Sequence, residues 1–98
     1  MELADIRKEI DEIDSQLLPL FLRRMKCAEQ VAAVKKEKNL PVFKAQREQE
    51  ILDRAAEKAG EYGQAVRGIY STMMSVSRER QYQLLESGNA LRELAASS

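Results

Sequence analysis

The chain of 98 residues contains 16 lysine and arginine residues and 16 aspartate and glutamate residues, so its formal net charge is zero. Charges of both signs are interspersed, which gives no electrostatic reason to expect a nucleic acid or an anionic membrane as a partner. The sequence has no histidine, the commonest general base and metal ligand, and no glycine-rich phosphate loop or Cys-x-x-Cys pair. We therefore expect neither a metal ion nor a cofactor.

Length and composition favour one all-α domain over residues 1–98. The chain is rich in Glu, Lys, Arg, Leu and Ala, a composition typical of helices. Its single cysteine, Cys27, has no partner for an internal disulfide, and no apolar run suits a membrane span or a signal peptide. We expect a reducing, cytoplasmic setting.

The first predicted helix covers about residues 3–37. Apolar residues recur along it every three or four positions, as on the apolar face of a helix: Leu3, Ile6, Ile10, Ile13, Leu17, Leu20, Cys27, Val31 and Val34. Pro19 removes one backbone hydrogen bond and costs on the order of 3 kcal/mol. Because the apolar pattern continues on both sides of Pro19, we expect one helix with a local bend near residues 15–19.

Two further helices are predicted after a break. Asn39, Leu40 and Pro41 end the first helix, since Pro41 lacks an amide hydrogen. The second helix covers about residues 44–59 and stops at Gly60, and the third covers about residues 64–93.

The length of the first helix predicts a homodimer. About 34 helical residues extend for about 50 Å, whereas a compact globule of this size has a radius of gyration of only about 12–13 Å. The helix must therefore project beyond its own subunit, and a second copy with a paired long helix is the simplest cover for its apolar face.

Polar side chains interrupt the apolar faces of all three predicted helices. Arg24 and Lys35 do so in the first helix, and Glu48 opens the face of the second. Ser77 and Gln81 lie one turn apart in the third. For each residue alone an ordinary structural role is the better expectation. Five interruptions together favour a polar pocket inside a helical bundle, because burying an unpartnered charge or amide is costly.

The predicted pocket is mainly positive, because Arg24, Lys35 and Arg47 outnumber Glu48. The planar fork of arginine suits a carboxylate. Arg24 and Lys35 are about 16 Å apart along the axis and almost three full turns apart, so they point to nearly the same side. We predict a small anionic ligand, with Glu48 accepting a hydrogen bond from a ligand hydroxyl.

With this pattern the sequence resembles the all-helical, type II chorismate mutases over nearly its whole length. The matching motifs, in chain order, are Arg7, Ile10 and Ile13-Asp14; Leu17-Leu18 and Arg23-Arg24; Lys35; Pro41-Val42; Arg47-Glu48; and Ser77 with Gln81. No single motif is specific, but their order and spacing together are.

The resemblance implies an intertwined homodimer of three-helix subunits with two equivalent sites. It also implies conversion of chorismate to prephenate in phenylalanine and tyrosine biosynthesis, by an intramolecular rearrangement that breaks an ether C–O bond while a C–C bond forms. Such a site must hold a flexible dicarboxylate in a near-attack geometry and stabilise negative charge on the ether oxygen.

The resemblance also assigns catalytic roles to individual residues. It implies that Arg24 binds one carboxylate of the substrate, and that Lys35 and Gln81 donate hydrogen bonds to the ether oxygen. It implies that Glu48 accepts a hydrogen bond from the ring hydroxyl.

Three further residues resemble the substrate-binding positions of the family. Arg47 and Ser77 would complete the polar wall, and Arg7 resembles the arginine that enters the site from the other subunit. Arg7 and Arg24 are about 25 Å apart along a helix and roughly 100° apart around it. One small ligand cannot touch both from one helix, but a crossing partner helix can bring Arg7 to the site.

Two positions depart from the family pattern. Lys44 stands where an acidic residue is usual, and we keep it as a substrate-binding candidate of altered charge. Pro19 stands where a good helix former is more usual. Neither change removes a residue needed for the contacts above.

Two other functions stay open. The scaffold also resembles isochorismate–pyruvate lyases, which eliminate pyruvate from a nearly identical dianion. The chain can instead be a non-catalytic helical dimerisation or regulatory module. Assays with both substrates separate the two enzymes, and a dimer that consumes neither substrate indicates the module.

Overall fold

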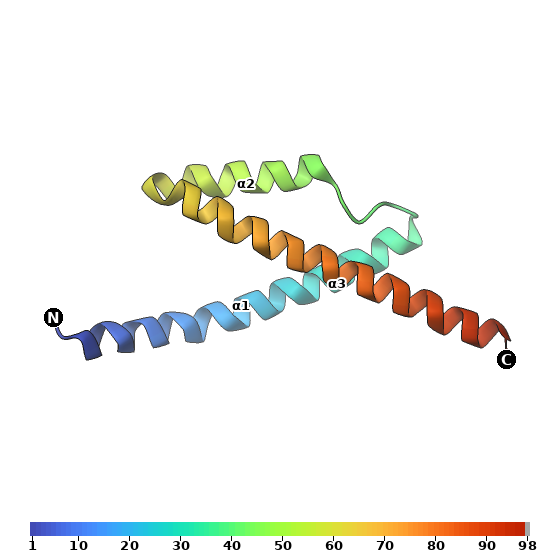
Figure 1. Cartoon of the computed structure of the whole chain (residues 1–98), viewed down its shortest axis with the longest axis horizontal. Helices are drawn as coiled ribbons and strands as arrows, with labels where there is room; N and C mark the ends of the chain where they lie inside the picture. Colours follow the sequence, from blue (N-terminus) through green and yellow to red (C-terminus); the bar gives the residue numbers. More distant parts are fainter. Residues whose placement is uncertain (98) are drawn as a thin grey trace.

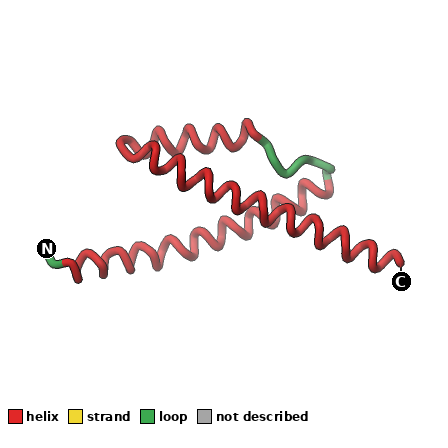
Figure 2. Tube along the Cα trace, viewed as in Figure 1, coloured by secondary structure: helices red, strands yellow, loops and turns green. Residues whose placement is uncertain are grey.

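The computed structural model describes the backbone of residues 1–97 and the side chains of residues 1–86. It consists of the helices α1 (Leu3–Glu37), α2 (Ala45–Ala59) and α3 (Gly63–Ser97), with the 3-10 turn η1 (Gly60–Tyr62) between α2 and α3. No strand occurs in the described backbone, so the predicted all-α class is confirmed. Figure 2 shows the connection between α1 and α2 as the main non-helical segment.

The helix ends lie close to the ranges expected from the sequence. The first helix has the expected ends and is continuous through Pro19. α2 begins one residue later than expected, and α3 runs from Gly63 to Ser97 instead of over residues 64–93. The longer third helix has a simple reason: no Gly or Pro follows residue 93, and alanine favours helix. Ser98, the last residue of the expected domain, lies outside the described residues.

Asn39 turns the chain at the end of α1. Its φ of 55° is in the left-handed region. The Leu40 amide donates to the Lys35 carbonyl at 2.7 Å, and the Asn39 amide donates to the Lys36 carbonyl at 3.3 Å. These are the two hydrogen bonds of a Schellman motif, which satisfies carbonyls that the helix end would leave free. The motif directs the chain back along the side of α1 that carries the Lys35 side chain.

α3 is the central helix of the subunit. It packs against α2 on one side and crosses the second half of α1 on the other, whereas α1 and α2 do not pack against each other within the described residues. Figure 1 shows this crossing: the first half of α1 lies on the opposite side of α3 from α2, and the end of α1 lies on the same side as α2. The buried residues gather near the crossing: Ala28, Ala32, Val42, Met74 and Gln81.

The subunit is extended and leaves a large apolar surface open. Its radius of gyration is 18.1 Å and its extents are 65 × 30 × 15 Å. The first half of α1 projects away from the other helices (Figure 1). Its apolar residues are mostly about half exposed: Leu3, Ile6, Ile10, Ile13, Leu17, Leu18 and Leu20.

The exposed area measures how open the chain is. It is 7968 Å², whereas a compact monomer of 11.2 kDa exposes roughly 5,700 Å².

None of the helices, over the residues described, is both long and apolar enough to cross a membrane.

Candidate active site

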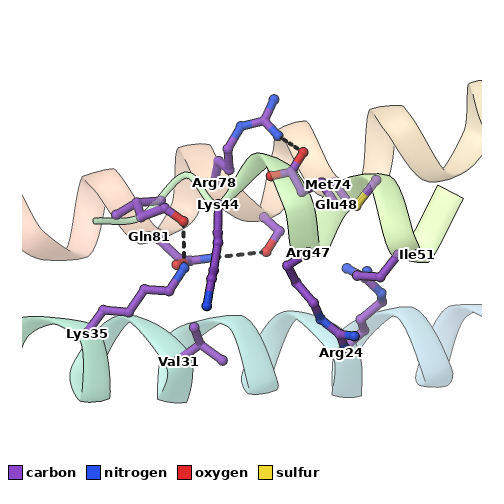
Figure 3. Close-up of a pocket in the computed structure, with 12 residues that line it drawn as sticks. Arg24, Val31, Lys35, Lys44, Arg47, Glu48, Ile51, Met74, Arg78 and Gln81 are labelled. Atoms are coloured by element: carbon purple, nitrogen blue, oxygen red, sulfur yellow. Dashed lines mark hydrogen bonds and ion pairs between the residues drawn. The ribbon is translucent and has the colours of Figure 1, made fainter. Parts of the chain in front are cut away.

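A pocket lies where α3 passes between α1 and the start of α2. Figure 3 shows side chains from all three helices and from the connection between α1 and α2 pointing toward it. Its lining residues are Arg24, Val31, Lys35, Val42, Lys44, Arg47, Glu48, Ile51, Met74, Ser77, Arg78 and Gln81. An adjoining hollow extends from Arg24 and Ser77 toward Cys27 and Ala28.

α1 contributes one wall through Arg24, Val31 and Lys35, which are seven and four residues apart and so share one helix face. The Lys35 ammonium donates to the carbonyl oxygen of Val42 at 2.5 Å. Because an ammonium has three donors, two remain for a ligand. Burial, and then the charge of Lys44, lower the pKa of Lys35 from its ordinary value of 10.5, while Glu48 opposes this shift.

α2 contributes its first turn. Lys44 is the N-cap residue, and Arg47 and Glu48 follow within the turn. A carboxylate is favourable there because backbone amides at a helix N-terminus carry partial positive charge. Glu48 forms an ion pair with Arg78 of α3, marked in Figure 3, and its side chain is 20% exposed.

α3 contributes the third wall. Met74, Ser77, Arg78 and Gln81 follow the i, i+3, i+4, i+7 spacing of one helix face. Gln81 is only 6% exposed, and its amide Nε2 donates to the Ser77 hydroxyl at 3.2 Å. The amide oxygen of Gln81 is buried and accepts no hydrogen bond from the described residues. A buried polar atom left unsatisfied is costly, so this amide is suited to a polar ligand.

The pocket is positively charged although the chain is neutral. Its charged lining comprises five cationic side chains and one carboxylate, that of Glu48. Val31, Ile51 and Met74 add apolar side chains to the lining. Such a site favours a small, polyanionic molecule, whose carboxylates meet arginine and whose other oxygens meet Lys35 and the amide of Gln81.

Seven of the eight residues expected at the site line this pocket: Arg24, Lys35, Lys44, Arg47, Glu48, Ser77 and Gln81. Arg7 does not line it and is exposed on the first half of α1. Arg78, which pairs with Glu48, was not expected at the site from the sequence. The spacing from Met74 through Ser77 to Arg78 could have indicated it, since these residues share one face of a helix.

The fold and the pocket define an all-α protein with a cation-lined pocket between its helices. The sequence model of the chorismate mutase type II family matches residues 6–82. The chain therefore belongs to the chorismate mutase type II family, as the motifs indicated.

Three curated relatives are similar in sequence. The chain is 43% identical over 53 residues to the chorismate mutase of Methanocaldococcus jannaschii, a match that covers 54% of each protein. It is 34% identical over 85 residues to the T-protein of Haemophilus influenzae, covering 82% of this chain and 22% of that protein. It is 42% identical over 53 residues to the bifunctional chorismate mutase/prephenate dehydratase of Aquifex aeolicus, a match that covers 54% of this chain and 15% of that protein. The matches thus span about half the length of these relatives or less.

A solved structure has a similar fold. The conserved hypothetical protein from Pyrococcus furiosus matches with a TM-score of 0.69 and 39% sequence identity. The similarity covers 81% of this chain and 93% of that one.

Proposed function

We propose that the protein is a chorismate mutase that converts chorismate to prephenate in aromatic amino acid biosynthesis. The observation that carries this proposal is one cation-lined pocket that contains seven of the eight candidate residues, in a chain of the chorismate mutase type II family. The rearrangement is intramolecular, so the site must bind, orient and stabilise charge, and needs no nucleophile.

Two arginines bind the carboxylates of the substrate. Arg24 and Arg47 approach the pocket from α1 and from the first turn of α2. Their guanidinium forks hold a dicarboxylate at two points, which restricts a flexible molecule to the near-attack geometry. Ser77 completes the polar wall of the pocket, and Lys44 adds a further positive charge at the N-terminus of α2.

Lys35 and Gln81 stabilise the ether oxygen as negative charge develops on it. Lys35 is held by its hydrogen bond to the Val42 carbonyl and keeps two free donors. Gln81 is fixed by burial and by Ser77. The Lys35 ammonium is already in place and needs no reorganisation during the reaction, which is the basis of electrostatic catalysis, whereas the Gln81 amide must first turn its Nε2 from Ser77 toward the ether oxygen. Glu48 accepts the ring hydroxyl of the substrate.

The active form is an intertwined homodimer in which Arg7 of the second subunit enters the site. The cavity of the single chain, about 130 Å³, is smaller than the roughly 300–1,000 Å³ typical of small-molecule sites. The chain also exposes about 2,300 Å² more surface than a compact monomer, an excess in the range that obligate dimers bury. A partner helix against the first half of α1 supplies both the missing cover and a further cation.

A cytoplasmic location agrees with the chemistry of the lone thiol. Cys27 is free and exposed on the subunit, and free thiols persist in reducing compartments. Cell fractionation tests this part of the proposal.

Loss of chorismate absorbance after addition of the purified protein tests the activity. We expect consumption of chorismate with formation of prephenate. Lys35→Ala should lower kcat about 10²–10³-fold, because it removes a donor to the developing oxyanion, while helical circular dichroism stays unchanged.

The competing functions give different results in the same assay. Release of pyruvate from isochorismate, without formation of prephenate from chorismate, identifies a lyase. A helical protein that consumes neither substrate contradicts the enzymatic proposal. A near-normal rate for Lys35→Ala contradicts the role given to Lys35.

A further inference from the structure

Arg78 makes two contacts that the proposed reaction does not use. Its Nη1 donates to Oε1 of Glu48, and the two side chains are 28% and 20% exposed. Its guanidinium carbon lies 5.0 Å from the centre of the Phe43 ring, within the range of a cation–π contact. Phe43 and Glu48 lie on either side of Lys44, the N-cap of α2. Arg78 therefore ties α3 to the segment that forms one wall of the pocket.

Several cationic side chains in the pocket can compete for the Glu48 carboxylate. Among the residues with described side chains, Glu48 is the only carboxylate that lines the pocket, and four cationic residues besides Arg78 line it: Arg24, Lys35, Lys44 and Arg47. A carboxylate free to rotate would pair with one of them and so occupy a donor that the ligand needs. In Figure 3 the Glu48 carboxylate is turned toward Arg78, while Lys35 and Arg24 lie across the pocket.

We propose that Arg78 is a positioning residue that holds one oxygen of Glu48 apart from the ligand-binding cations, so that the other oxygen accepts the substrate hydroxyl. A carboxylate has two acceptor oxygens, and the ion pair with Arg78 involves Oε1. The guanidinium is itself held by the Phe43 ring, which limits the positions that Arg78 and Glu48 can take as a pair. This inference rests on the proposed chorismate mutase activity.

A double-mutant cycle tests whether Arg78 acts through Glu48. The variants are Arg78→Met, Glu48→Gln and the combination, and the measurement is kcat/KM for chorismate. We expect Arg78→Met alone to lower kcat/KM about 10-fold, and less than about 2-fold when Glu48 is already Gln. A role in general stability, or a direct contact with the substrate, would cause the same loss in both backgrounds. An equal loss, or no loss in the single variant, overturns the proposal.

Arg80→Met is the matched control. Arg80 lies two residues further along α3 and pairs with Glu29 of α1 at 3.4 Å, so the variant also removes one charge and one partly buried ion pair. Arg80 does not line the pocket. We expect its kcat/KM to stay within about 2-fold of the unmodified protein. A loss equal to that of Arg78→Met assigns the effect to α3 packing and contradicts the proposal.

A crystal structure of Arg78→Met separates this inference from the proposed function. We expect the Glu48 carboxylate to move within hydrogen-bond distance of Lys35, Lys44 or Arg47. If Glu48 keeps its original position, the inference fails while the chorismate assay stands. If the unmodified protein consumes no chorismate, the proposed function fails, and the crystal structure still decides whether Arg78 holds Glu48.

Discussion

Gln81 shows how a single residue prepares the pocket for a ligand. Its side chain is buried, with its amide oxygen unsatisfied within the described chain and its Nε2 donating to Ser77. The Ser77 hydroxyl can both donate and accept. If the side-chain amide of Gln81 flips about its terminal C–C bond, the Ser77 hydroxyl can donate to the amide oxygen. Nε2 is then free to donate to an ether oxygen of the ligand. A ligand with an acceptor at this place relieves the cost of the unsatisfied atom.

The pKa of Lys35 should set the alkaline limit of the pH range in which the protein is active. Burial and the charge of Lys44 lower the pKa of Lys35 below 10.5. In the proposed mechanism the ammonium is the active form, and the lowered pKa means that it is lost at a lower pH than for an ordinary lysine. We expect kcat/KM, which reports groups of the free enzyme, to fall on the alkaline side below pH 10.5. Lys44→Ala removes the second cause of the lowered pKa and should move this limit to higher pH.

Lys36→Ala is the control for the Lys44 variant. Lys36 follows Lys35 on α1 but does not line the pocket. Its removal should leave the alkaline limit in place. A limit that Lys44→Ala does not move, or that Lys36→Ala moves as far, contradicts the assignment of the limit to Lys35 and Lys44.

At the scale of elements, two local devices fix the walls of the site. The Schellman motif at Asn39 ends α1 and returns the chain so that the Val42 carbonyl meets Lys35. The second device joins α2 to α3: Asp53 Oδ1 accepts hydrogen bonds from Gln49 and from Arg67, both at 3.0 Å. The first sets the path of the connection into α2, and the second holds α2 against α3.

The Asp53 cluster should stabilise the fold in a pH-dependent way. Hydrogen bonds from Gln49 and then Arg67 lower the pKa of Asp53 below its ordinary value of 3.8. A lowered carboxyl pKa stabilises the folded state above the unfolded value, and this stabilisation is lost as the pH falls through the folded value. We expect Asp53→Asn to lower the thermal midpoint slightly at about pH 7 and to have almost no effect at about pH 2.

Glu57→Gln is the matched comparison on the same helix. Glu57 is exposed and takes no part in the Asp53 cluster. It should not lower the midpoint at either pH. If Asp53→Asn lowers the midpoint equally at both pH values, the effect does not come from ionisation of Asp53.

At the scale of the whole molecule, the open shape of the subunit is its main feature. A radius of gyration of 18.1 Å exceeds the roughly 12–13 Å of a compact chain of this length. α1 is one helix over Arg7 and Arg24, which keeps these residues about 25 Å apart along its axis. The exposed apolar side chains beside Arg7 therefore mark the face on which we expect the second subunit.

Mixing two inactive variants tests the shared site. In the proposed homodimer, Arg7→Ala and Arg24→Ala each remove one arginine from both sites, so each variant alone should be inactive. After unfolding and refolding together, each heterodimer contains one site with both arginines intact. Random pairing then gives roughly a quarter of the unmodified activity. Absence of recovery, with heterodimers demonstrated by mass spectrometry, contradicts a site shared between subunits.

The sequence predicted much of this arrangement because the relevant signals are local. Apolar periodicity and composition identified an all-helical chain. Lys35, Glu48 and Gln81 were found because each is polar at a position where the periodicity calls for an apolar residue. The end of the third helix was less predictable, because no Gly or Pro marks it.

The sequence by itself determined the helices, their apolar faces and the polar residues that interrupt them, since these depend on neighbours within one or two turns. Only the tertiary structure decided that Arg78 pairs with Glu48, 30 residues away, and that Lys35 donates to the Val42 carbonyl. Both contacts depend on how α3 packs against α2 and on where the connection returns after Asn39. Packing of side chains fixes those relations, and no spacing along one helix encodes them.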